Sequence, residues 1–254
     1  MEGGRFTGFG RLLALSLAAF GVFGLWVGCS AVLLADLSRA LGLSPGPLGI
    51  SLFAGAAASM VAMASLGWTA DRYGRRSFLV AVTCVFGLGT VGLALAGNFA
   101  ALVGVFVVLY SAAGLYDVGI NAAAVDLERL SGRRLMSLLH ALYAVGAVFG
   151  SLGAGALLSA GVDFRLIYLA LLVPLAAVTI GVALTRFPKH NGVRAEPSPE
   201  AVEDDAAGRW RLYRSAPLLL VAAIAGLGFI SERVMETWSG IYLRGTLGLG
   251  ALLG

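Results

Sequence analysis

Polar residues recur at helical spacing within the fourth long apolar run of the sequence. They are Tyr110, Asp117, Asn121 and Glu128. Their spacing of seven, four and seven positions places them on one face of an α-helix. An apolar environment favours the neutral form of a carboxylate, so a buried Asp117 could bind and release a proton. We expect Asp117 to carry a proton or contact a ligand. The alternative is that Asp117 bonds Asn121 or a neighbouring helix and only stabilises the helix bundle.

A histidine follows in the fifth apolar run. His140 lies early in this run, and imidazole exchanges a proton near neutral pH. It could therefore relay protons or donate a hydrogen bond to a ligand hydroxyl, and a purely structural hydrogen bond explains it equally well. Gly146 and Gly150 follow four positions apart, which is typical of a face where two membrane helices pack closely.

The last apolar run carries acidic and aromatic residues together. Glu232, Glu236 and Ser239 share one helical face, and Trp238 and Tyr242 share another. Aromatic rings beside hydrogen-bonding groups suit a sugar, which has apolar C–H faces and many hydroxyls. Trp and Tyr are also enriched at the membrane–water interface, and this explains the two rings without a ligand.

A dense cluster of charge interrupts the apolar sequence at GWTADRYGRRS (67–77). Neither Leu48–Gly67 before it nor Phe78–Gly97 after it contains a charged residue. Gly74 permits a tight backbone turn, and arginines suit anionic lipid headgroups. Asp71 is not explained in this way, because a carboxylate at the end of a membrane helix needs a cation or a helix N-terminus.

The elements that must position these residues are membrane helices. The chain is 59% hydrophobic and 13% charged, and soluble domains have about 25% charged residues. A span takes about 20 apolar residues, and backbone hydrogen bonding in lipid requires a helix or a closed barrel. Continuous apolar runs favour helices. Seven spans are predicted, over 11–35, 47–69, 77–97, 100–123, 135–160, 165–186 and 215–244.

The distribution of basic residues predicts the orientation of these spans. With the N-terminus in the cytoplasm, 14 of the 18 Lys and Arg residues fall in cytoplasmic segments and only three in outer ones. Cytoplasmic loops are enriched in these residues. The net charge of +4 therefore reflects membrane topology and does not indicate a nucleic-acid partner. We expect a multi-pass protein of a bacterial inner membrane, in contact with lipid.

The cluster at 67–76 resembles the signature loop of the major facilitator superfamily in spacing, residue types and position between the second and third helices. Thr69, where the family usually has an apolar residue, is the one departure. The resemblance implies two six-helix halves, each made of inverted three-helix repeats, around a midplane site. It also implies a gating loop in which Asp71 caps a helix of the opposite half. The residues assigned to this gating loop are Gly67, Asp71, Arg72, Gly74, Arg75 and Arg76.

The resemblance divides the chain into three parts. Residues 1–186 correspond to the first six-helix half, 187–213 to a cytoplasmic linker, and 214–254 to a seventh helix with the possible start of an eighth. The surface that Asp71 should contact is then missing from this sequence. We expect a fragment or a truncated gene product that needs its missing half. The alternative is a half-transporter in which two copies assemble.

Three of the stretches also resemble the fucose:proton symporter branch of the superfamily. They are the Asp117/Asn121 pair, the stretch Leu139–Gly146 and the stretch Thr237–Leu243. The resemblance implies that Asp117 is the proton-binding carboxylate. The substrate-site residues are then Asn121, His140 and Glu232, joined on chemical grounds by Trp238 and Tyr110. Symporters of this branch also use an acid in the first helix, for which Asp36 is a weak match because it lies near the outer end.

These features predict proton-coupled transport of a small polar solute, of which a sugar is one candidate. Proton-driven efflux of amphipathic compounds is the alternative within transport. A non-transporting membrane subunit is the alternative outside it. We expect no enzyme activity, because the sequence contains no HExxH motif and no pair of histidines in a shared site. No cofactor or metal ion is predicted.

Overall fold

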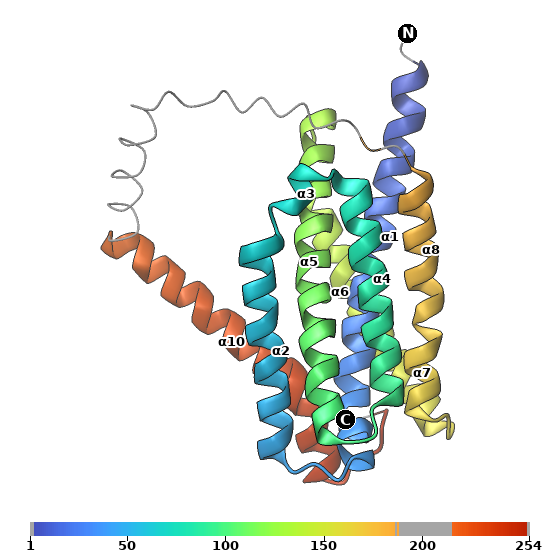
Figure 1. Ribbon diagram of the computed structural model, residues 1–254, viewed down its shortest axis with the longest axis vertical. Coiled ribbons are helices and arrows are strands. Elements are labelled where there is room, and N and C mark those ends of the chain that lie inside the picture. The colour runs from blue at the N-terminus through green and yellow to red at the C-terminus, as the bar shows by residue number, and fades with distance from the viewer. Residues whose placement is uncertain (1–2, 186, 188–214, 253–254) are drawn as a thin grey trace. The chain divides into compact units, whose positions relative to one another are not determined.

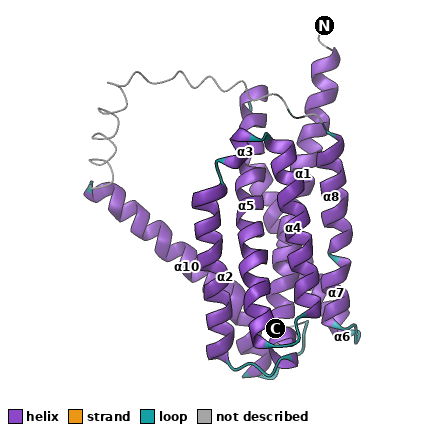
Figure 2. Cartoon of the chain, in the orientation of Figure 1, coloured by secondary structure: helices purple, strands orange, loops and turns teal. Residues whose placement is uncertain are grey.

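The computed structural model describes residues 3–185, 187 and 215–252, which form helices joined by short turns (Figures 1 and 2). No strand occurs in this part of the chain. The chain groups into two compact units, a first unit of Met1–Lys189 with Gly240–Gly254 and a second of His190–Ser239. The linker predicted at 187–213 lies outside the described residues, apart from Phe187.

Among the described residues, seven helical segments are long and apolar enough to cross a membrane, which confirms the predicted all-α membrane architecture. The segment Phe164–Leu184 combines two consecutive helices, and a single helical turn lies between the second and third spans. The helices are α1 (Gly3–Ala40), α2 (Pro45–Leu66), α3 (Thr69–Arg72), α4 (Arg75–Leu95), α5 (Phe99–Ser131), α6 (Met136–Ser159), α7 (Phe164–Ala170), α8 (Leu172–Leu184) and α10 (Ala216–Gly245).

The fourth span extends farther than the sequence indicated. It was predicted to end at residue 123, whereas α5 continues to Ser131, where Gly132 takes a left-handed conformation with φ 66°. The prediction was too short because Asp126 and Glu128 interrupt the apolar sequence. Both carboxylates have partners, so the helix continues past them. Asp126 pairs with Arg75, and Glu128 accepts hydrogen bonds from backbone N–H groups.

Close backbone contact holds α1 against α6. A methyl group at Gly24 of α1 would overlap the carbonyl of Tyr143, and one at Gly150 of α6 would overlap the carbonyl of Leu25. Only glycine permits this approach. The predicted packing role of the Gly146/Gly150 face is thus confirmed, and its partner helix is α1.

Aromatic side chains form the core between α1, α4 and α5. The rings of Trp26 and Phe86 lie 4.9 Å apart, and those of Phe86 and Tyr116 lie 5.8 Å apart. Trp26 Nε1 donates to Thr90 Oγ1 at 3.0 Å, and the Tyr116 hydroxyl donates to the carbonyl of Ala19 at 3.1 Å. The polar ends of the rings therefore have partners, as buried polar groups require.

The outer faces of the helices remain apolar. The apolar part of α6 is mostly exposed, whereas half of the apolar part of α4 is buried. Large hydrophobic side chains such as Phe53 and Met60 of α2 and Phe149 of α6 are exposed. Exposed surface of this composition suits lipid or another membrane-embedded partner better than water.

Candidate functional site

Asp117 and Asn121 form a polar pair within the apolar span of α5. Asn121 Nδ2 donates to Asp117 Oδ1 and to the Asp117 carbonyl, each at 2.9 Å. Both residues are half-buried. This bond lies within one helix, so it orients the carboxylate without itself joining two helices. A carboxyl group held by an amide donor in an apolar span can carry either a charge or a proton.

Tyr110 lies two turns from Asp117 on the same helix. Its ring stacks on that of Phe106 at 5.1 Å between centroids, and it contacts α2 at Gly55. The side chain is half-buried. Seven residues of helix separate it from Asp117 by about 10 Å along the axis. Tyr110 therefore shares the face of Asp117 but packs at the boundary between α5 and α2.

His140 lies on α6 and is exposed. Its ring meets that of Phe20 of α1 edge to face, with centroids 5.3 Å apart. One turn further along α1, the ring of Phe23 contacts Tyr143 at 5.6 Å and Tyr116 at 5.3 Å. Tyr116 directly precedes Asp117 in α5. Aromatic rings of α1 thus connect the His140 region of α6 to the Asp117 region of α5.

The two site residues predicted in the seventh span lie in the second unit. Glu232 is exposed and Trp238 is half-buried, and both belong to α10. Their six-residue separation is about 9 Å along the helix. Asp117, Asn121, Tyr110 and His140 all belong to the first unit, and a hydrogen bond joins Asp117 to Asn121. Participation of Tyr110 and His140 in one site with this pair stays a prediction, as does that of Glu232 and Trp238.

The charged loop at 67–76 folds as α3 followed by a turn at Gly74. Gly74 has φ 83°, a backbone conformation that side chains disfavour, and α4 begins at the next residue. Asp71 Oδ1 lies 2.6 Å from Arg75 Nη1, so the carboxylate finds the cation that the sequence analysis required. Asp71 remains 63% exposed, which leaves it accessible to a further partner.

Arg75 connects this loop to α5. Its Nε lies 3.0 Å from Asp126 Oδ2, and the Arg75 side chain is only 11% exposed. One guanidinium thus joins two carboxylates, Asp71 and Asp126, that come from different elements. Sequence reasoning missed Asp126. The available signal was a carboxylate at the loop end of an apolar helix, which requires a cation, opposite a cluster of arginines.

The other loop arginines are exposed and have different surroundings. The guanidinium of Arg72 lies 5.4 Å from the ring centroid of Trp68 and 5.8 Å from that of Tyr73. Arg76 is exposed at the start of α4. Stacked or exposed cations at a helix end suit anionic lipid headgroups. The three arginines of the loop therefore differ: Arg75 bridges Asp71 and Asp126, whereas Arg72 and Arg76 lie at the surface.

Glu128 has a structural role at the loop between α5 and α6. Its Oε1 accepts hydrogen bonds from the backbone N–H groups of Leu135 and Met136, at 2.5 and 2.8 Å. These groups open α6 and have no partner within the helix. Glu128 therefore fixes the start of the helix that carries His140. Within the described residues, no group of three His, Cys, Asp or Glu side chains could hold a metal ion.

Comparison with known proteins gives a consistent result. Residues 12–254 match the family model of the Major Facilitator Superfamily. An uncharacterized MFS-type transporter of Yersinia pestis is 27% identical over 231 residues, which is 91% of this chain and 57% of that protein. An uncharacterized transporter of Sinorhizobium fredii is 33% identical over 138 residues, 53% of this chain and 33% of the relative.

A third relative is an uncharacterized MFS-type transporter of Bacillus subtilis. It is 27% identical over 208 residues, which is 80% of this chain and 38% of that protein. The chain thus spans about half, or less, of the length of the curated relatives it matches. The family match points to transport and away from enzymatic catalysis.

Proposed function

The chain belongs to the Major Facilitator Superfamily, and from this premise we propose that its protein is a secondary active transporter. It moves a small polar solute across the membrane by alternating access and couples this movement to protons. A sugar is the candidate solute, through the resemblance to the fucose:proton symporter branch. The protein is multi-pass, and its proposed location is a bacterial inner membrane with the N-terminus in the cytoplasm.

The observation that carries this proposal is the Asp117/Asn121 pair. A carboxyl group in an apolar span is retained there at considerable cost, so it has a functional role by default. Asn121 holds one carboxylate oxygen of Asp117 at 2.9 Å. Protonation removes the negative charge of Asp117 without breaking this hydrogen bond, because Asp117 Oδ1 can still accept it from Asn121 Nδ2. The pair can therefore change charge while keeping its geometry.

The proposed solute site extends from this pair to its neighbours. His140 supplies a titratable donor and acceptor, and it stands beside the aromatic rings of α1. Aromatic surfaces with a few polar groups suit the apolar faces and hydroxyls of a sugar. The proposed substrate-contacting residues are Asn121, His140, Tyr110, Glu232 and Trp238, with Asp117 as the proton carrier.

The loop at 67–76 is the proposed gate on the cytoplasmic side. Arg75 holds Asp71 at the loop end of the first unit, and Asp71 keeps most of its surface exposed. An exposed carboxylate that is fixed in place can accept hydrogen bonds from the backbone N–H groups at the N-terminus of a further helix. We propose that this helix comes from a second six-helix half or from a second copy of the chain.

The test compares Asp117→Asn with Asp163→Asn in membrane vesicles. Asp163 is an exposed carboxylate at the start of α7 and serves as the control. Accumulation of labelled neutral monosaccharides, fucose among them, is measured with an imposed proton gradient. We expect Asp117→Asn to abolish accumulation and Asp163→Asn to retain it. Gradient-driven accumulation that survives in Asp117→Asn refutes the coupling role, and proton-driven export of an amphipathic dye would support efflux instead.

A further inference from the structure

Two reciprocal contacts between a glycine and a larger side chain form the boundary between α2 and α5. A methyl group at Gly55 of α2 would overlap the ring of Tyr110 of α5. Four residues further along both helices, a methyl group at Gly114 of α5 would overlap the hydroxyl of Ser59 of α2. Each glycine thus leaves room for the side chain opposite, and the Ser59 hydroxyl lies against the backbone of α5.

Ser59 meets α5 on the face that carries the proposed site. Gly114 comes four residues after Tyr110 and three residues before Asp117, so all three share one helical face. Asp117 is therefore about 5 Å along the axis from the turn that Ser59 contacts. Ser59, Tyr110 and Asp117 are all half-buried. The Ser59 hydroxyl thus lies between the levels of Tyr110 and Asp117.

The hydroxyl of Ser59 differs from those of the other two serines of α2. Ser51 and Ser65 each donate to the backbone carbonyl four residues earlier, that of Pro47 at 3.0 Å and that of Val61 at 2.6 Å. Serine in a helix commonly makes this bond. Within the described part of the chain, the Ser59 hydroxyl makes no hydrogen bond. It can therefore donate one hydrogen bond and accept others from a group that reaches this face.

We propose that Ser59 extends the solute site from α5 to α2, and that its hydroxyl forms a hydrogen bond with a hydroxyl group of the solute. This inference rests on the proposed transport function. Apart from its three serines, α2 contains only apolar residues, so Ser59 is the group of this helix that can recognise a polar solute at this level. Gly114 is then a positioning residue, because it admits Ser59 to the face of α5.

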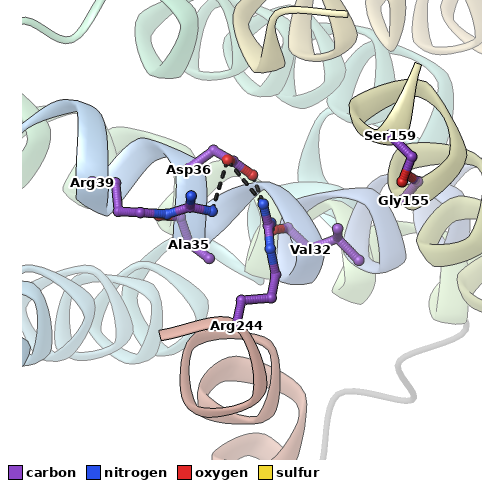
Figure 3. Close-up of polar contacts among 7 residues, drawn as sticks. All are labelled: Val32, Ala35, Asp36, Arg39, Gly155, Ser159 and Arg244. Atoms are coloured by element: carbon purple, nitrogen blue, oxygen red, sulfur yellow. Dashed lines mark hydrogen bonds and ion pairs between the residues drawn. The ribbon is translucent and has the colours of Figure 1, made fainter. Parts of the chain in front are cut away.

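Asp117 is the carboxylate whose charge should affect position 59. Asp36 of α1 is held at the end of its own helix by Arg244 at 2.6 Å and by Arg39 at 2.9 Å, so its charge is compensated there (Figure 3). Asp117 instead lies on the helix that Ser59 contacts. A negative charge nearby disfavours the thiolate, which is the reactive form of a cysteine. A cysteine at position 59 should therefore react faster when Asp117 is neutralised.

The first experiment needs no solute. Ser59→Cys is made in the full-length protein with Cys29 and Cys84 replaced by alanine, and labelling by a small water-soluble thiol reagent is followed in membrane vesicles near pH 8. We expect labelling, and an acceleration of about threefold or more on adding Asp117→Asn. The matched control is Ser65→Cys, about 9 Å further along α2. Its rate should change by less than about twofold.

The second experiment asks whether Ser59 contacts the solute. Accumulation of labelled neutral monosaccharides is measured in vesicles for Ser59→Ala, which removes a single atom. Losing one hydrogen bond to the solute should raise KM about three- to tenfold and leave the maximal rate within about twofold. Gly114→Ala should also raise KM, because its methyl group displaces Ser59. Gly104→Ala, whose methyl group would meet nothing within 4 Å, is the matched control on α5.

The two experiments separate this inference from the proposed function. If no monosaccharide accumulates but labelling at position 59 responds to Asp117, the sugar proposal fails and the place of Ser59 in the site of Asp117 is supported. If monosaccharides accumulate and Ser59→Ala keeps the parental KM, transport stands and the inference is overturned. A position 59 that the reagent does not reach, or a labelling rate that Asp117→Asn leaves unchanged, also overturns it.

Discussion

Replacing Arg75 by glutamine should destabilise the loop end of the first unit, mainly through Asp126. Arg75 is 11% exposed and Asp126 is 20% exposed, whereas Asp71 is 63% exposed. Removing one partner of a fully buried pair costs about 3–5 kcal/mol, and an exposed pair contributes about 0–1 kcal/mol. Because Asp126 keeps some contact with solvent, we expect a loss of about 2–3 kcal/mol for Arg75→Gln.

The two carboxylates give the matched comparison. Asp126→Asn should destabilise clearly, because it leaves the shielded guanidinium with one exposed partner. Asp71→Asn should have a small effect, because its contact with Arg75 lies in solvent. The double variant Arg75→Gln with Asp126→Asn should be less destabilised than the sum of the two, because each single variant already breaks the same Arg75–Asp126 contact.

The assay is the apparent melting temperature of the detergent-solubilised protein, read from the monodisperse peak after heating. A change of 1 kcal/mol shifts the Tm of a domain of 150–250 residues by about 2–4 °C. Arg75→Gln should therefore lower the apparent Tm by about 5–10 °C, and Asp71→Asn by about 4 °C or less. Equal effects of Asp71→Asn and Asp126→Asn would show that Arg75 does not act mainly through Asp126, and so would single effects that add in the double variant.

Two further predictions concern the packing of the first unit. Gly24→Leu should prevent α1 from packing on α6 and abolish the monodisperse peak. The control Gly153→Ala, on the open side of α6, should leave the peak unchanged. A monodisperse peak in Gly24→Leu would contradict the close contact between α1 and α6. Thr90→Val should remove the acceptor of the buried Trp26 N–H and cost about 1–3 kcal/mol in thermal unfolding, and an unchanged Tm would show that the hydrogen bond contributes nothing.

The sequence predicted the elements well because membrane helices follow from local composition. Uncharged apolar runs as long as Leu48–Gly67 leave few alternatives. The i,i+4 spacing of Asp117 and Asn121 predicted that they share a helix face, whereas their hydrogen bond was only one part of the structural alternative. The predicted end of α5 was too early because hydropathy falls at Asp126 and Glu128. The helix continues there because both carboxylates have partners.

The contacts that the sequence did not predict join residues far apart in the chain. Arg75 and Asp126 are separated by 51 positions, and Asp36 and Arg244 by 208. Each residue alone could be recognised as a charge near a membrane boundary. Their pairing depends on which helices become neighbours, and a single sequence contains no direct signal for that. Asp36 in particular had been weighed as a first-helix acid, whereas the structure shows it in an ion pair at the helix end.

The most direct test of the proposed function is solute-induced proton movement in vesicles that contain the protein. Neutral monosaccharides are added to lightly buffered vesicles without an imposed gradient, and the external pH is recorded. If sugar and protons enter together, a transported sugar should raise the external pH. Asp117→Asn should abolish this pH change while still exchanging labelled for unlabelled sugar. Sugar entry without a pH change in the unaltered protein, or an undiminished pH change in Asp117→Asn, would rule out proton coupling through Asp117.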